Sequence, residues 1–161
     1  MSSLRHLMTK DGLDVKMIPD RLQYYTNRLE DWKSDLSLEN KNLRDTLIDQ
    51  HSIAAYYDEI KAELSTFVAY LELMRDKRAG EVNQMIKENS KFDHSDRSIG
   101  LLIKKDTDYL FYERLRMEAD ELYHRAYGIC NQFQQRAYTL TNIVKVMEKE
   151  LQDVTLTKEH G

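Results

Sequence analysis

The sequence contains few of the residues that interrupt helices, with one proline and five glycines among 161 residues. An all-β fold needs turn residues at short intervals, so this scarcity argues against one. A single cysteine, Cys130, excludes a disulfide framework within the chain. No apolar run approaches the roughly 18 residues that span a bilayer, and residues 1–6 lack the apolar core of a signal peptide. We therefore expect one cytoplasmic, all-α domain with no membrane contact.

An apolar stripe with helical spacing occupies the last third of the chain. Between Leu115 and Val154 apolar residues recur in steps of three and four, and only Gly128 weakens the helix. A single stripe on a long helix has to be buried against another helix, from the same chain or from a second copy. We predict this second long helix over residues 107–155. The core or oligomer seam comprises Leu115, Leu122, Ile129, Phe133, Leu140, Val144, Met147 and Leu151.

A similar stripe precedes it. Pro19 favours a helix start, because a proline in the first turn loses no needed N–H. The stripe then continues to Met74, and Gly80 is a typical helix C-cap. We predict a first long helix over 19–79, with 49–52 as the place to expect a break, after a short helix within 1–18. An irregular connector over 80–106 would let the two long helices fold back as an antiparallel hairpin with coiled-coil-like packing.

The charge is unevenly distributed. The net charge is −4, yet residues 75–105 carry eight basic and five acidic side chains, and both flanking segments are net negative. The positive segment is either a solvated connector of mixed charge or an anion-binding patch. For the second interpretation, the candidate DNA-binding residues are Arg75, Lys77, Arg78, Lys87, Lys91, Arg97, Lys104 and Lys105.

The sequence contains only fragments of catalytic or metal-binding motifs. Glu121-x-x-His124 matches half of a di-iron motif, but no other glutamate has a histidine three residues on. Asp106-x-Asp108 suits either Mg²⁺ or the N-terminus of a helix, and we favour the helix cap. Cys130 adjoins the apolar stripe and is better explained as a buried structural thiol than as a nucleophile. We therefore expect no enzyme activity, no cofactor and no metal.

Ten tyrosines are the remaining unusual feature. They are explained either as wide core and interface residues whose hydroxyls reach water, or as platforms on which the bases of a single strand stack. The aromatic residues close enough to the basic segment to serve the second role are Phe92, Tyr109 and Tyr112.

Three blocks of residues resemble a known family. The first is Asp14-Val15 followed by Leu22-Gln23-Tyr24 and Trp32. The second is Leu101-Leu102 followed by Asp106-x-Asp108-x-Leu110, and the third is Arg136-Ala137-Tyr138-x-Leu140-x-Asn142-Ile143. In this order they resemble the UvsY family of recombination mediators of T-even phages. The chain departs from that family in its acidity and in the absence of two aromatic residues before Gly80.

The resemblance implies a small helical phage protein of the bacterial cytoplasm that forms a ring-shaped homo-oligomer. Such proteins bind single-stranded DNA, interact with a RecA-like recombinase and with single-strand-binding protein, and help load the recombinase onto covered strands without catalysing a reaction. The alternative is a structural helical oligomer that acts as an adaptor between proteins and does not bind DNA.

Overall fold

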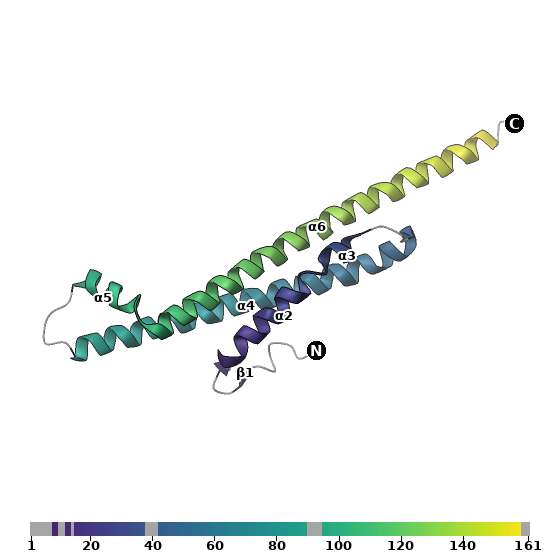
Figure 1. Ribbon diagram of the computed structural model, residues 1–161. Coiled ribbons are helices and arrows are strands. Elements are labelled where there is room, and N and C mark those ends of the chain that lie inside the picture. Colours follow the sequence, from purple (N-terminus) through teal and green to yellow (C-terminus); the bar gives the residue numbers. More distant parts are fainter. Residues whose placement is uncertain (1–7, 10–11, 14, 38–41, 90–94, 159–161) are drawn as a thin grey trace.

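The chain is all-α apart from one minimal β pair. The computed structural model describes residues 8–9, 12–13, 15–37, 42–89 and 95–158 (Figure 1). Two helices dominate, α4 (Leu43–Asn89) and α6 (Thr107–Lys158). They lie side by side and run in opposite directions, because Gln50 contacts Phe133 while Arg75 contacts Glu113. None of the described helices is long and apolar enough to cross a membrane.

The N-terminal segment differs from the prediction of a short helix. Strands β1 (Met8–Thr9) and β2 (Gly12–Leu13) pair antiparallel, and the 3-10 helix η1 (Val15–Met17) follows. An Asp-Gly sequence at 11–12 favours a reversal of the chain over a helix. The rest of 1–14 lies outside the described residues. Helix α2 (Ile18–Arg28) begins where Pro19 predicts, with proline in its first turn.

The predicted single helix over 19–79 is wrong. Helix α2 ends at Arg28, α3 (Trp32–Leu36) is short, and α4 starts only at Leu43. Asn42 caps α4, since its Oδ1 accepts a hydrogen bond of 2.8 Å from the backbone N–H of Asp45. The break predicted at 49–52 is wrong as well, because α4 runs through these residues. Within this stretch, Gln50 donates to the Phe133 carbonyl at 2.9 Å. The chain therefore reverses before residue 43, and α2 and α3 pack beside the two long helices.

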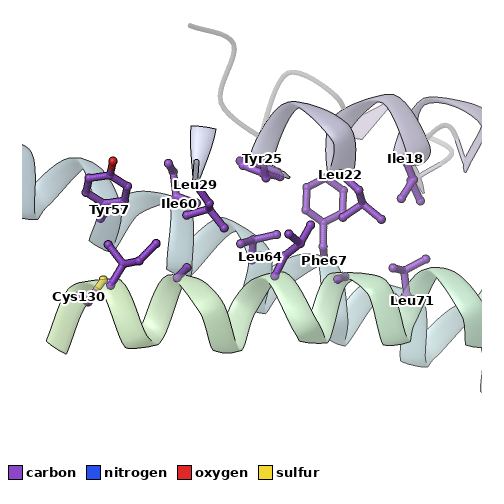
Figure 2. Close-up of a cluster of buried hydrophobic side chains, with 14 of the residues drawn as sticks. Ile18, Leu22, Tyr25, Leu29, Tyr57, Ile60, Leu64, Phe67, Leu71 and Cys130 are labelled. Carbon is purple, nitrogen blue, oxygen red and sulfur yellow. The ribbon is translucent and has the colours of Figure 1, made fainter. Parts of the chain in front are cut away.

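The core forms where α2, α4 and α6 meet (Figure 2). Tyr25 of α2 meets Phe67 of α4 edge to face, with ring centroids 5.9 Å apart, and Tyr57 of α4 stacks on Phe133 of α6 at 5.2 Å. The hydroxyls of these buried tyrosines donate to carboxylates, Tyr25 to Glu63 and Tyr57 to Asp35. These hydroxyls bond to protein groups instead of reaching water, and they fix α2 and α3 against α4.

The predicted connector is largely helical. Helix α4 continues through Gly80, which lies on an exposed face where an added Cβ would meet nothing within 4 Å. Glycine lowers helix stability by about 1 kcal/mol, and the helical residues on both sides with buried Val82 outweigh that cost. Helix α5 (Asp96–Ile103) follows, capped by the Ser95 hydroxyl and anchored by buried Ile99. Gly80 as a C-cap and an irregular 80–106 are thus wrong where the chain is described.

Candidate nucleic-acid interface

Arg78 joins the end of α4 to the start of α6. Its Nε and Nη2 donate to the two carboxylate oxygens of Asp106 at 2.9 and 2.8 Å. The same guanidinium lies 3.2 Å from Asp108 and 3.4 Å from Glu81. Asp106 also accepts the backbone N–H of Tyr109 at 2.9 Å, so it caps α6 as predicted. Hydrogen bonding from Arg78 lowers the pKa of Asp106 to about 2. Arg78 is therefore engaged within the protein.

Arg75 forms a second junction one turn away. Its guanidinium lies 3.0 Å from Glu113 of α6 and 2.8 Å from Asp76. Glu113 also accepts from Arg116 at 3.0 and 3.1 Å. Hydrogen bonds from Arg116 and then from Arg75 lower the pKa of Glu113 to about 2. Two of the predicted DNA-binding residues, Arg75 and Arg78, thus hold the long helices together.

The other predicted cations face solvent. Lys91 lies outside the described residues, whereas the remaining five are exposed and form no ion pair with any described residue. They are Lys77, Lys87, Lys104, Lys105 and Arg97. The end of α4, helix α5 and the turn before α6 gather at one end of the molecule (Figure 1). We call these five residues the free cations.

Some of the acidic residues near the free cations are paired with arginine. Arg78 contacts Asp106, Asp108 and Glu81, whereas Glu88 accepts a hydrogen bond of 2.8 Å from the amide of Gln84, which carries no charge. Arginine suits this role, because its planar fork can bind several carboxylate oxygens at once. The arrangement leaves the lysines available to an external anion.

The aromatic candidates are less exposed than base stacking requires. Tyr109 and Tyr112 are half-buried, burial raises the pKa of Tyr112, and Phe92 lies outside the described residues. Phe111, which the sequence pattern did not single out, is 43% exposed. The sequence feature that could have identified it is the pair of adjacent apolar residues Leu110-Phe111, neither of which belongs to the seam. Exposed Arg114 on the same helix was missed as well.

Comparisons with known proteins add no assignment to this geometry. No family model, curated protein or solved structure matches the chain.

The predicted seam of α6 divides into two parts. Leu115, Leu122, Ile129, Phe133 and Leu140 are buried, whereas Val144 is half-buried and Met147 and Leu151 are exposed. The reason is length: Gln50 of α4 contacts Phe133 of α6, α4 begins only seven residues before Gln50, and α6 continues far beyond Phe133 (Figure 1). We call α6 from residue 141 onward the overhang.

His124 and Cys130 lie in different environments. His124 lies on the surface, 3.7 Å from Asp120, and Cys130 is buried. Burial raises the pKa of the Cys130 thiol to about 11, which lowers its nucleophilicity at neutral pH. Within the described ranges, no group of three or more His, Cys, Asp or Glu side chains is arranged to hold a metal ion.

Proposed function

We propose that this protein is a recombination mediator that binds single-stranded DNA as a homo-oligomer and helps load a RecA-like recombinase onto strands covered by single-strand-binding protein. The observation that carries the DNA-binding part is the group of five free cations at one end of an otherwise acidic molecule. The resemblance of the three sequence blocks to the UvsY family supports the rest.

The proposed binding is electrostatic. Lysine and arginine side chains displace condensed counterions from phosphates without reading the base sequence. One protomer offers few such contacts, but copies in a ring would present many to one strand, and every contact after the first becomes intramolecular. Assembly is therefore part of the mechanism, because it turns weak individual sites into a strong combined one.

The overhang is the proposed means of assembly. Ile143, Val146 and Met147 are 37%, 55% and 48% exposed, and with Thr139 and Asn142 they line a shallow hollow of about 340 Å³. Met147 continues the stripe that α4 covers further back on α6, and Ile143 and Val146 lie beside that stripe on the same stretch of helix. Packing against the overhang of another copy, in the manner of a coiled coil, would bury it.

An adaptor that assembles without DNA is the second candidate. The engagement of Arg75 and Arg78 in internal ion pairs favours it, because it removes two cations from the patch that the sequence predicts. The exposed apolar overhang fits both candidates, so self-association alone does not distinguish them.

Native mass spectrometry with and without a short oligodeoxynucleotide tests the proposal. We expect an oligomer that takes up the oligonucleotide. If each protomer engages about three phosphates, the log–log dependence of affinity on salt has a slope of roughly −2 per protomer, at about −0.7 per contact. An oligomer that ignores the oligonucleotide supports the adaptor, and a chain that stays monomeric with and without it contradicts both. Exchange of single-strand-binding protein for a RecA-like recombinase on a covered strand tests the loading step.

A further inference from the structure

Large apolar side chains lie among the free cations at the end of the molecule. Leu101 and Leu102 of α5 are 57% and 39% exposed, and Leu110 and Phe111 of α6 are 50% and 43% exposed. Single exposed apolar residues are ordinary on protein surfaces, whereas apolar residues that gather on a surface mark interaction sites. These four lie within eleven residues, on two consecutive helices. We call these four residues the corner patch.

The backbone between α5 and α6 keeps the corner patch compact. The N–H of Lys105 donates to the Leu102 carbonyl at 3.0 Å, and the N–H of Leu110 donates to the Asp106 carbonyl at 3.1 Å. The turn between the helices is thus only a few residues long and hydrogen-bonded at both ends. Arg78 holds Asp106 in this turn from α4. The apolar and cationic side chains are therefore presented from a fixed corner.

The cations nearest to the corner patch are available to an external ligand. Lys104 and Lys105 follow the leucines of α5 after Ile103, Arg97 lies on the same helix, and all three are exposed with no ion pair to a described residue. Asp106 and Asp108, the acids that follow in the chain, share the guanidinium of Arg78, and exposed Asp96 precedes Arg97. A ligand at this corner meets cationic and apolar side chains together.

This combination favours one class of partner. A nucleic-acid backbone uses the cations but leaves the leucines and Phe111 exposed to water. A protein segment that carries carboxylates and large apolar side chains contacts the cations and the apolar residues of this corner at the same time. We propose that the corner patch binds an acidic peptide segment of a partner protein, with its carboxylates on Arg97, Lys104 and Lys105 and its apolar side chains on the corner patch.

The proposed peptide site does not depend on DNA binding. If both activities exist, the peptide and the DNA compete for Lys104 and Lys105, so a partner that carries such a segment would be exchanged against the strand. If only the peptide binds, the protein is the adaptor that does not bind DNA, which is the second candidate function described above.

Fluorescence anisotropy with a labelled synthetic peptide tests the inference. The probe is a twelve-residue peptide that alternates aspartate with leucine and phenylalanine, and the reference peptide has serine in place of every apolar residue. We expect saturable binding of the first peptide and at least tenfold weaker binding of the second. Equal binding of the two peptides, or binding of neither, overturns the inference.

Variants of the full chain separate apolar from ionic contributions. Leu101→Ser with Leu102→Ser should weaken peptide binding at least tenfold while oligodeoxynucleotide binding changes less than twofold. The control is Ile48→Ser, at another exposed apolar residue, 64% exposed, near the opposite end of α4. Circular dichroism confirms that each variant remains helical. An unchanged peptide affinity in the double variant contradicts the site, as does binding to anionic lipid vesicles in place of the peptide. Failure of the unsubstituted protein to bind the oligonucleotide, with peptide binding retained, would contradict only the proposed function.

Discussion

Arg78 and Asp106 are 28 residues apart in sequence and are joined by two hydrogen bonds of 2.9 and 2.8 Å. The contact links α4 near its C-terminal end to the residue that caps α6. A carboxylate that caps a helix and pairs with an arginine is fixed in two directions. The contact therefore sets where α6 starts relative to α4, and with it the position of the free cations and the corner patch.

Acidification should weaken the fold at two ion pairs between α4 and α6, Arg78 with Asp106 and Arg75 with Glu113. The pKa values of Asp106 and Glu113 are lowered from their ordinary 3.8 and 4.5 to about 2. A carboxylate with a lowered pKa in the folded state stabilises the fold above its unfolded pKa, and this stabilisation is lost as the pH falls toward the folded pKa. We expect the urea midpoint to fall between about pH 5 and pH 2. Asp106→Asn with Glu113→Gln should show a shallower fall; an identical pH dependence would contradict the role of these junctions.

Truncation of Phe133 should destabilise the core strongly. Its side chain is 1% exposed and stacks on Tyr57, so Phe133→Ala leaves a cavity between α4 and α6. We expect a loss of about 3–5 kcal/mol in the free energy of unfolding, measured by denaturant titration. Tyr138→Ala is the matched control on the same helix, because Tyr138 is 68% exposed and its loss should change stability by less than about 0.5 kcal/mol. Equal effects of the two variants would contradict the helix register.

The sequence predicts long helices better than chain reversals. The stripe of α6 and the start of α2 at Pro19 follow from periodicity and proline chemistry alone. The reversal before Leu43 does not, since no proline or glycine lies between Asp20 and Arg44, and the apolar spacing of α2 resembles a continuation into α4. It depends on Tyr25 and Leu29 packing on partners far along the chain, which a local pattern does not contain.

Prediction of the candidate site was limited in a similar way. Composition identifies the basic segment, but it does not reveal which cations are engaged between helices, because the acids of α6 that bind Arg75 and Arg78 lie 38 and 28 residues further on. Gly80 illustrates the same limit. Its propensity favours a helix end, and the surrounding helical residues together with buried Val82 outweigh it.

Removal of a buried charge should be tolerated at Arg136. This residue is 8% exposed, its Nη1 donates to the Asp35 carbonyl at 3.0 Å, and its Nε has no hydrogen-bond partner among the described residues. Burial lowers the pKa of the guanidinium, because desolvation disfavours its charged form. We expect Arg136→Met to be neutral or stabilising by up to about 1 kcal/mol in denaturant titration. Arg136→Ala should be destabilising, because it also removes the side-chain stem; a strongly destabilised methionine variant would contradict the argument.

The turn lysines should contribute to DNA affinity in proportion to their charge. Replacement of Lys104 and Lys105 by alanine removes two phosphate contacts from each protomer. We expect the salt slope to become shallower by roughly 1.4 per protomer, at about −0.7 per contact, in an anisotropy titration with an oligodeoxynucleotide. Lys145→Ala with Lys149→Ala removes the same charge from the overhang and should leave the slope unchanged. Equal changes in both double variants would indicate that net charge, not the free cations, governs binding.

A charged side chain on the overhang should dissociate the oligomer without unfolding the protomer. Val146 and Met147 are exposed in the single chain and lie beyond the part of α6 that α4 covers, so neither contributes to the core in Figure 2. Val146→Glu with Met147→Glu would bury two carboxylates if copies pack there, which is strongly unfavourable. We expect a monomer by sedimentation with little change in circular dichroism, and with weaker oligonucleotide binding because the combined site is lost. Glu148→Gln with Glu150→Gln, at exposed positions on the same turns, is the control and should retain the assembly. If the apolar-to-glutamate variant keeps its mass, the copies associate through another surface.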